Sequence, residues 1–136
     1  MSLKSLLRRK GIIMGTVYKF EELECWQSAR ELVAMVYQYT QSGKISKDYG
    51  FKDQIRRASV SVMNNISEGF TRYGRKEMIR FFNIAQSSAS EVMSMTYAMD
   101  DLYYQPTEIC EKIRSKAFEA RNKTLAFMRY QIEKPS

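Results

Sequence analysis

The sequence predicts an all-α protein folded as an antiparallel up-down-up-down four-helix bundle. Apolar residues recur every three or four positions through most of the 136 residues, the spacing that places them on one face of a helix. Glycine and proline are scarce, at 6 and 2 copies, whereas folds made of many short strands need frequent turns. With 44% hydrophobic and 27% charged residues, the composition fits a single domain with one core.

The first two helices are expected near residues 21–42 and 50–72. The apolar positions of the first are Leu23, Trp26, Ala29, Val33, Val36, Tyr37 and Thr40. This segment stops at Ser42-Gly43, because glycine readily adopts the backbone conformation that ends a helix. The positions that share one face of the second are Phe51, Ile55, Ala58, Val62, Asn65, Ile66 and Gly69.

The last two helices are expected near residues 75–104 and 107–132. The face of the third contains Met78, Phe81, Phe82, Ala85, Ser88, Ala89, Val92, Met95, Met99 and Leu102. Pro106 ends it, because proline cannot continue a helix, and Thr107 is suited to cap the fourth. The face of the fourth contains Ile109, Ile113, Ala117, Ala120, Thr124, Phe127 and Gln131. Short connections between such segments make neighbouring helices antiparallel.

The first part of the chain differs in composition from the rest. Residues 1–13 carry four basic side chains and no acidic one, so residues 1–19 are expected to form a flexible basic tail before a bundle domain at 20–134. Met14 is as plausible a first residue as Met1. No apolar run approaches the ~20 residues needed to span a membrane, and no secretory leader is evident. A cytoplasmic location is the expectation.

The residue inventory excludes several kinds of chemistry. With 0 histidines there is no Ser-His or Cys-His nucleophile and no histidine metal ligand. Cys25 and Cys110 lie far apart in the sequence and are expected to be free thiols. We therefore expect no metal, no cofactor and no enzymatic activity. An enzyme using Glu68 and Glu91 is disfavoured, because no base, nucleophile or metal cluster accompanies them.

A polar stripe crosses the second predicted helix. Arg57, Ser61, Asn64 and Glu68 follow one another at helical spacing, and Asn65 adjoins them on the apolar side. A buried amide must find a hydrogen-bond partner, and Glu68 at i+3 is one candidate for Asn65. We interpret Arg57, Asn64, Asn65 and Glu68 as a structural polar network that fixes the helix register. A partner-binding role for the same residues is the alternative.

The net charge of +7 attracts phosphate or acidic proteins, although a solubilising surface explains it equally well. Residues 50–76 contain six basic and two acidic side chains. The turn before the third helix combines basic groups with an aromatic ring that can stack on a base. The candidate residues for binding nucleic acid or a protein partner are Arg56, Arg72, Tyr73, Arg75 and Lys76, with Arg57 less certain because its stripe favours an internal pair.

Three motifs together resemble one family. They are F-x-x-L-x-x-W-Q-x-A from Phe20, R-R-A-x-x-S-[IV]-x-x-N-I-x-E-G from Arg56, and R-F-x-x-I-A-x-x-S-x-x-E from Arg80. The chain resembles, from about Phe20 to Ile132, the four-helix-bundle proteins named after the intervening sequence of bacterial 23S ribosomal RNA genes. Ser67 and Ser87 depart from the usual alanine and glycine, and both replacements are small.

The resemblance implies a homopentameric ring of antiparallel four-helix bundles. It also implies kinship with the accessory protein of diversity-generating retroelements, a basic pentameric bundle that partners a reverse transcriptase and nucleic acid. No enzymatic activity is established for the family. The composition itself indicates only self-association, because nine tyrosines and nine methionines exceed what a thin bundle can bury.

The resulting expectation is a non-enzymatic homo-oligomer, a pentamer by the resemblance, whose basic surface contacts RNA, DNA or a nucleoprotein partner such as a reverse transcriptase. The alternative is a protein-interaction scaffold that binds an acidic protein and no nucleic acid. The salt dependence of binding separates both from non-specific charge effects, and nucleic-acid affinity is expected to fall steeply with salt because each neutralised phosphate releases counterions.

Overall fold

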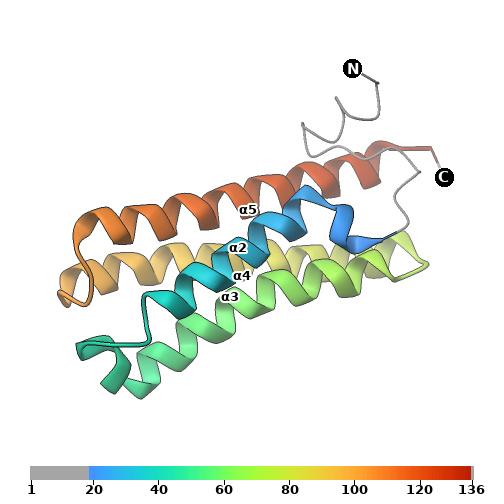
Figure 1. Cartoon of the computed structure of the whole chain (residues 1–136). Helices are drawn as coiled ribbons and strands as arrows, with labels where there is room; N and C mark the ends of the chain where they lie inside the picture. The colour runs from blue at the N-terminus through green and yellow to red at the C-terminus, as the bar shows by residue number, and fades with distance from the viewer. Residues whose placement is uncertain (1–18, 136) are drawn as a thin grey trace.

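The computed structural model describes residues 19–135, which form four long α-helices and no strand (Figure 1). The helices are α2 (Glu24–Gln38), α3 (Tyr49–Phe70), α4 (Arg75–Asp101) and α5 (Thr107–Glu133). Two short 3-10 helices, η1 (Phe20–Glu22) and η2 (Lys44–Lys47), lie before α2 and α3. The predicted all-α class is thereby confirmed. The tail expected at residues 1–19 falls almost wholly outside the described residues.

The helices alternate in direction around a shared core. α3 packs against α2 and α4, and α5 packs against α4 and α2 (Figure 1). Contacts between α2 and α5 pair Glu31 with Lys116 and Ser28 with Lys123, so rising numbers in one helix meet falling numbers in the other. The bundle is therefore closed by the pairing of its first and last long helices.

The predicted apolar faces form this core. Its largest fully buried side chains include Leu23, Leu32, Ile55, Ile66, Phe82, Met99 and Ile113. The rings of Phe82 and Phe127 meet edge to face with their centroids 5.1 Å apart, joining α4 to α5. Gly69 is buried against Phe82, and the missing side chain lets the ring of Phe82 lie directly beside the backbone of α3.

The first long helix is shorter than the expected 21–42. Leu23 has an extended backbone, with φ −72° and ψ 126°, and this residue separates η1 from α2. Its side chain is fully buried. At the other end α2 stops at Gln38, and the hydroxyl of Thr40 donates back to the carbonyl of Val36 over 2.7 Å. Gly43 has a φ of 75°, so the glycine that was expected to end the helix serves the following turn instead.

The other helix ends lie close to their expected positions, with one difference in capping. Thr107 does not cap α5; it is the first helical residue, preceded by Pro106, and its hydroxyl donates to Asp100 over 2.8 Å. The start of α3 is capped instead by Asp48, whose carboxylate accepts from the backbone N–H of Phe51 over 3.2 Å. Asp48 also accepts from the hydroxyl of Tyr104 over 2.6 Å, which ties the two loops at this end together.

Among residues 19–135, no helix combines the length and the apolar character needed to cross a membrane.

Candidate functional site

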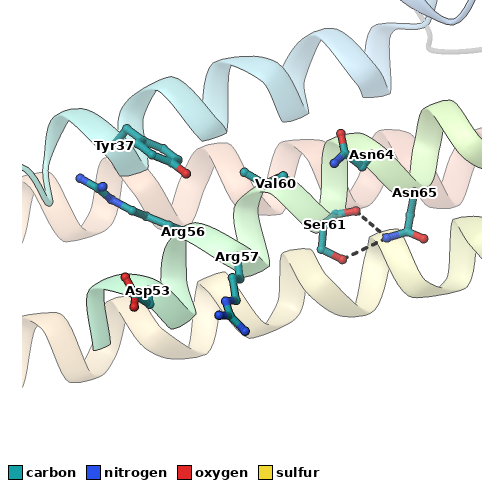
Figure 2. Close-up of a pocket in the computed structure, with 8 residues that line it drawn as sticks. All are labelled: Tyr37, Asp53, Arg56, Arg57, Val60, Ser61, Asn64 and Asn65. Atoms are coloured by element: carbon teal, nitrogen blue, oxygen red, sulfur yellow. Dashed lines mark hydrogen bonds between the residues drawn. The ribbon is translucent and has the colours of Figure 1, made fainter. Parts of the chain in front are cut away.

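The outer face of α3 forms an open groove with a volume of about 630 Å³ (Figure 2). Its lining comes from α3 and from one residue of α2: Tyr37, Asp53, Arg56, Arg57, Val60, Ser61, Asn64 and Asn65. Figure 2 shows Arg56 directed toward Tyr37 and Arg57 directed to the other side of α3. Three residues of the predicted polar stripe, Arg57, Ser61 and Asn64, thus line a surface groove, and Glu68 lies outside it.

Arg56 is held in place from two sides. Its Nε donates to the buried hydroxyl of Thr40 over 2.8 Å, and its guanidinium carbon lies 4.3 Å from the centre of the Tyr37 ring. Arg56 is predicted from the sequence as a binding residue, but in the structure it is half-buried with one N–H already used. The guanidinium is consequently a fixed donor rather than a mobile surface charge.

Asn65 does not bond to Glu68, the candidate partner. Its amide donates to the carbonyl of Ser61 over 2.8 Å and to the Ser61 hydroxyl over 3.0 Å. The Ser61 hydroxyl in turn lies 2.8 Å from the hydroxyl of Ser88 on α4. Asn65 is half-buried, so this short chain of polar groups joins α3 to α4 at the edge of the core.

The other members of the expected network lie apart from it. Glu68 is exposed and pairs with Arg72, one helical turn away, over 2.8 Å. Arg57 and Asn64 are exposed, and neither side chain has a hydrogen bond or ion pair among the described residues; the backbone carbonyl of Asn64 accepts from the hydroxyl of Ser67. The four residues therefore do not form one network within this chain: of the four, only Asn65 is linked to another helix, through Ser61 and Ser88.

The basic turn, which we define as residues 71–76 together with Arg80 and Lys134, brings five cationic side chains to one end of the bundle. The guanidinium carbons of Arg72 and Arg80 lie 4.8 Å and 4.7 Å from the centre of the Phe81 ring. Arg75 donates to the backbone carbonyl of Lys134 over 2.8 Å. Glu68 and Glu77 pair with Arg72 and Arg80, so ion pairs compensate two of these five charges.

Tyr73 and Lys76 are the least engaged of the predicted binding residues. Tyr73 is fully exposed at the tip, next to a shallow hollow that it shares with Arg75 and Lys134. Lys76 is exposed and has no hydrogen bond or ion pair among the described residues. The tip therefore presents one free ring and one free ammonium group beside anchored guanidinium groups.

Sequence reasoning missed two cross-helix arrangements. Arg114 of α5 repeats the arrangement of Arg56: its Nε donates to the buried hydroxyl of Thr96 over 2.9 Å, and its guanidinium carbon lies 3.7 Å from the centre of the Tyr97 ring. The adjacent threonine and tyrosine in α4 were visible in the sequence. The arginine that meets them was not, because periodicity does not fix how two helices are rotated against each other.

The second missed arrangement is an ion-pair cluster between α2 and α5. Lys116 bonds to Glu31 over 2.6 Å and to Glu119 over 2.8 Å. The hydrogen bond to Glu119 is the main reason why the pKa of Lys116 is raised, and the same bond lowers the pKa of Glu119. This cluster fixes α5 against α2, and the two glutamates compensate the charge of Lys116.

Among the described residues, no group of three or more His, Cys, Asp or Glu side chains is arranged to hold a metal ion.

The fold and this surface define an all-helical bundle with an arginine-rich turn at one end. Residues 21–126 match the family described as 23S rRNA-intervening sequence protein, and the chain belongs to that family. The resemblance inferred from the three sequence motifs is thereby confirmed.

Comparison with solved structures supports the fold. The chain is similar to a protein of unknown function from the S23 ribosomal protein family of Bacteroides thetaiotaomicron VPI-5482, with a TM-score of 0.70 and 20% sequence identity. The match covers 77% of this chain and 98% of that one. At this identity the likeness concerns the architecture alone. A comparison with curated proteins found no match.

Proposed function

We propose that this protein is a non-enzymatic, cytoplasmic homo-oligomer that contacts RNA or a nucleoprotein partner through its basic turn. The observation that carries the proposal is the arrangement around Tyr73: a fully exposed ring with Lys76 free beside it and anchored arginines behind. Cations supply affinity for phosphate without reading sequence, and an exposed ring can stack on an unpaired base.

Self-association is part of the proposal. Large apolar side chains remain exposed on elements away from the middle of α5, among them Tyr49, Leu102, Tyr103 and Ile132. Covering such surface stabilises an assembly, and the resemblance to the family suggests a ring of five. A ring repeats the basic turn, so that several weak phosphate contacts act together. Light scattering over a range of concentrations tests this; a mass near 16.0 kDa throughout contradicts assembly.

A matched pair of double variants tests RNA binding. Lys76→Gln with Lys134→Gln removes two charges from the basic turn and leaves the Lys134 carbonyl, which accepts from Arg75, in place. Lys44→Gln with Lys47→Gln removes two exposed charges at the opposite end of α3. We expect the first pair to weaken binding of a labelled RNA stem-loop and flatten its salt dependence, and the second to leave both unchanged.

Two results contradict the proposal. One is equal loss of affinity in both double variants, which would make the charge a general solubilising property. The other is wild-type binding no tighter than that of an unrelated protein of similar charge. Tyr73→Ser adds a test of stacking. Removing an aromatic ring that stacks on a base typically weakens the binding free energy by about 1–3 kcal/mol.

A further inference from the structure

The two sides of α5 differ in how their cations are compensated. On the side toward α2, Lys116 has two glutamate partners, and Lys123 lies 3.6 Å from Glu119 and donates to Ser28. On the side toward α4, the arginines have no such partner among the described residues. The two sides of α5 therefore differ in charge compensation.

We define the α4–α5 face by two stripes at helical spacing. The stripe of α5 contains Arg114, Phe118, Arg121 and Leu125, and the stripe of α4 contains Gln86, Ser90, Met93 and Tyr97. The bond between Arg114 and Thr96 shows that the two stripes adjoin. None of the eight carries a negative charge: two are arginines, Gln86 and Ser90 are polar and uncharged, and the other four are aliphatic or aromatic.

Both arginines of this face contain a buried N–H group that lacks an acceptor. They are Nη2 of Arg114 and Nε of Arg121, which have no hydrogen-bond partner among the described residues. A buried donor without an acceptor destabilises the folded state, and native proteins seldom leave one unpaired. The neighbouring rings of Tyr97 and Phe118 are 57% and 49% exposed, so the face combines unmet donors with uncovered apolar surface.

We propose that the α4–α5 face docks an acidic helical segment of a partner protein. Arg114 and Arg121 are separated by seven residues, about 10 Å along the helix axis. A docked helix with two carboxylates at the same spacing can meet both guanidinium groups, while an apolar side chain between them covers Phe118. Arg114 and Arg121 are half-buried, and a slender carboxylate side chain can approach such a guanidinium more closely than a duplex phosphate, which is fixed on a bulky backbone.

A second copy of this chain is a poor occupant. Within the described helices, carboxylates seven residues apart occur only at Glu24 and Glu31 of α2. Glu31 already bonds to Lys116, so this pair is not free to bind elsewhere. The docking proposal is independent of the proposed RNA contact, which uses residues at the basic turn.

The test uses a synthetic helical peptide of about 20 residues, with two glutamates seven residues apart and a leucine between them. A second peptide of identical composition has its glutamates on opposite helix faces. Fluorescence anisotropy measures the affinity of each for the full chain. We expect the first peptide to bind more tightly, and Arg121→Gln to weaken it about tenfold, because hydrogen bonds to charged groups are worth that much.

Matched variants separate docking from general charge attraction. Lys112→Gln removes one exposed charge from the same helix on another face and is expected to leave the affinity unchanged. Phe118→Ser, at a half-exposed position, is expected to weaken binding without affecting the helical circular dichroism. Arg121→Glu is expected to have no measurable affinity for the acidic peptide and to bind a peptide in which lysines replace the two glutamates.

Three outcomes overturn the docking proposal. The first is equal binding of the two peptides, or equal loss in Lys112→Gln and Arg121→Gln. The second is a change in oligomer mass by light scattering in Arg121→Gln, which would make the face a contact between copies. The third is loss of RNA stem-loop affinity in Arg121→Gln, which would make it a nucleic-acid surface. Failure of the Lys76 and Lys134 test alone leaves this proposal standing.

Discussion

The ring of Phe82 lies 3.0 Å from the place that a β-carbon on Gly69 would occupy. The β-carbon of Phe81 lies 3.1 Å from the same place, so α4 meets α3 directly at this glycine. Such a separation is shorter than ordinary van der Waals contact, and a side chain here would push the two helices apart.

Gly69→Ala is therefore expected to destabilise the protein by about 1–3 kcal/mol, the usual effect of overpacking a core. The better helix propensity of alanine offsets up to about 1 kcal/mol of this. Gly50→Ala is the matched control, because its β-carbon would meet nothing closer than 3.9 Å. Urea denaturation of both variants checks the prediction. Similar urea midpoints would show that α3 and α4 move apart at residue 69 without a loss of stability.

The neighbouring asparagines provide a second matched pair. Asn65→Ala removes the donor to Ser61 and is expected to cost about 1–3 kcal/mol of unfolding free energy. Asn64→Ala, at an exposed position, is expected to change stability by less than about 0.5 kcal/mol. Thermal melting and light scattering compare the two. If Asn65→Ala has the stability and the mass of the wild type, the hydrogen bonds from Asn65 to Ser61 do not contribute to the stability of the fold.

The hydrogen bond between Tyr104 and Asp48 predicts how stability depends on pH. The bond from Tyr104, together with the one from Phe51, lowers the pKa of Asp48 below 3.8. The stability that this carboxylate adds is present above pH 3.8 and is lost as the pH falls through its lower folded value. The same bond raises the pKa of Tyr104 above 10.0, so its contribution is lost as the pH rises beyond that value.

Tyr104→Phe is expected to make the unfolding free energy depend less on pH at both the acid and the alkaline end. At acid pH only the bond from the backbone N–H of Phe51 would still lower the pKa of Asp48. Unfolding free energies of the wild type and the variant, measured across the pH range, decide this. A variant whose acid limb is as steep as that of the wild type would place the dependence in other carboxylates.

Both cysteines are predicted to be unreactive in the folded protein. Burial raises the pKa of Cys25 to about 12, and its side chain is 3% exposed. Burial also raises the pKa of Cys110. Because the thiolate is the reactive species, iodoacetamide in mildly alkaline buffer should label neither residue until denaturant is added. Mass spectrometry of native and unfolded samples reads the result; rapid native labelling would indicate an opening of the α2 or α5 end.

The sequence was sufficient to predict the four helices because each one buries a single face. Periodicity alone located α3, α4 and α5 to within a few residues. It misplaced the ends of α2, where the extended Leu23 and the hydroxyl of Thr40 interrupt the helical backbone. Such interruptions depend on packing and on the bond from Arg56, and neither can be read from apolar spacing.

The site was less predictable, because its contacts join different helices. The amide of Asn65 did need a partner, but a side chain in a helix leans toward the preceding turn, and Ser61 lies there. Glu68 was within reach of Arg72 for the same reason. Thr40 with Arg56 and Thr96 with Arg114 pair only once two helices have taken a particular rotation.

The bond from Arg75 to the carbonyl of Lys134 has a practical consequence for handling the protein. It places the end of α5 against the tip that holds Tyr73 (Figure 1). An affinity tag or fluorescent protein fused directly after Pro135 would therefore start beside the surface under test and shield it from a large ligand. A small dye coupled to a cysteine introduced at Ser42, an exposed position at the far end of the bundle, would report binding without obstructing it.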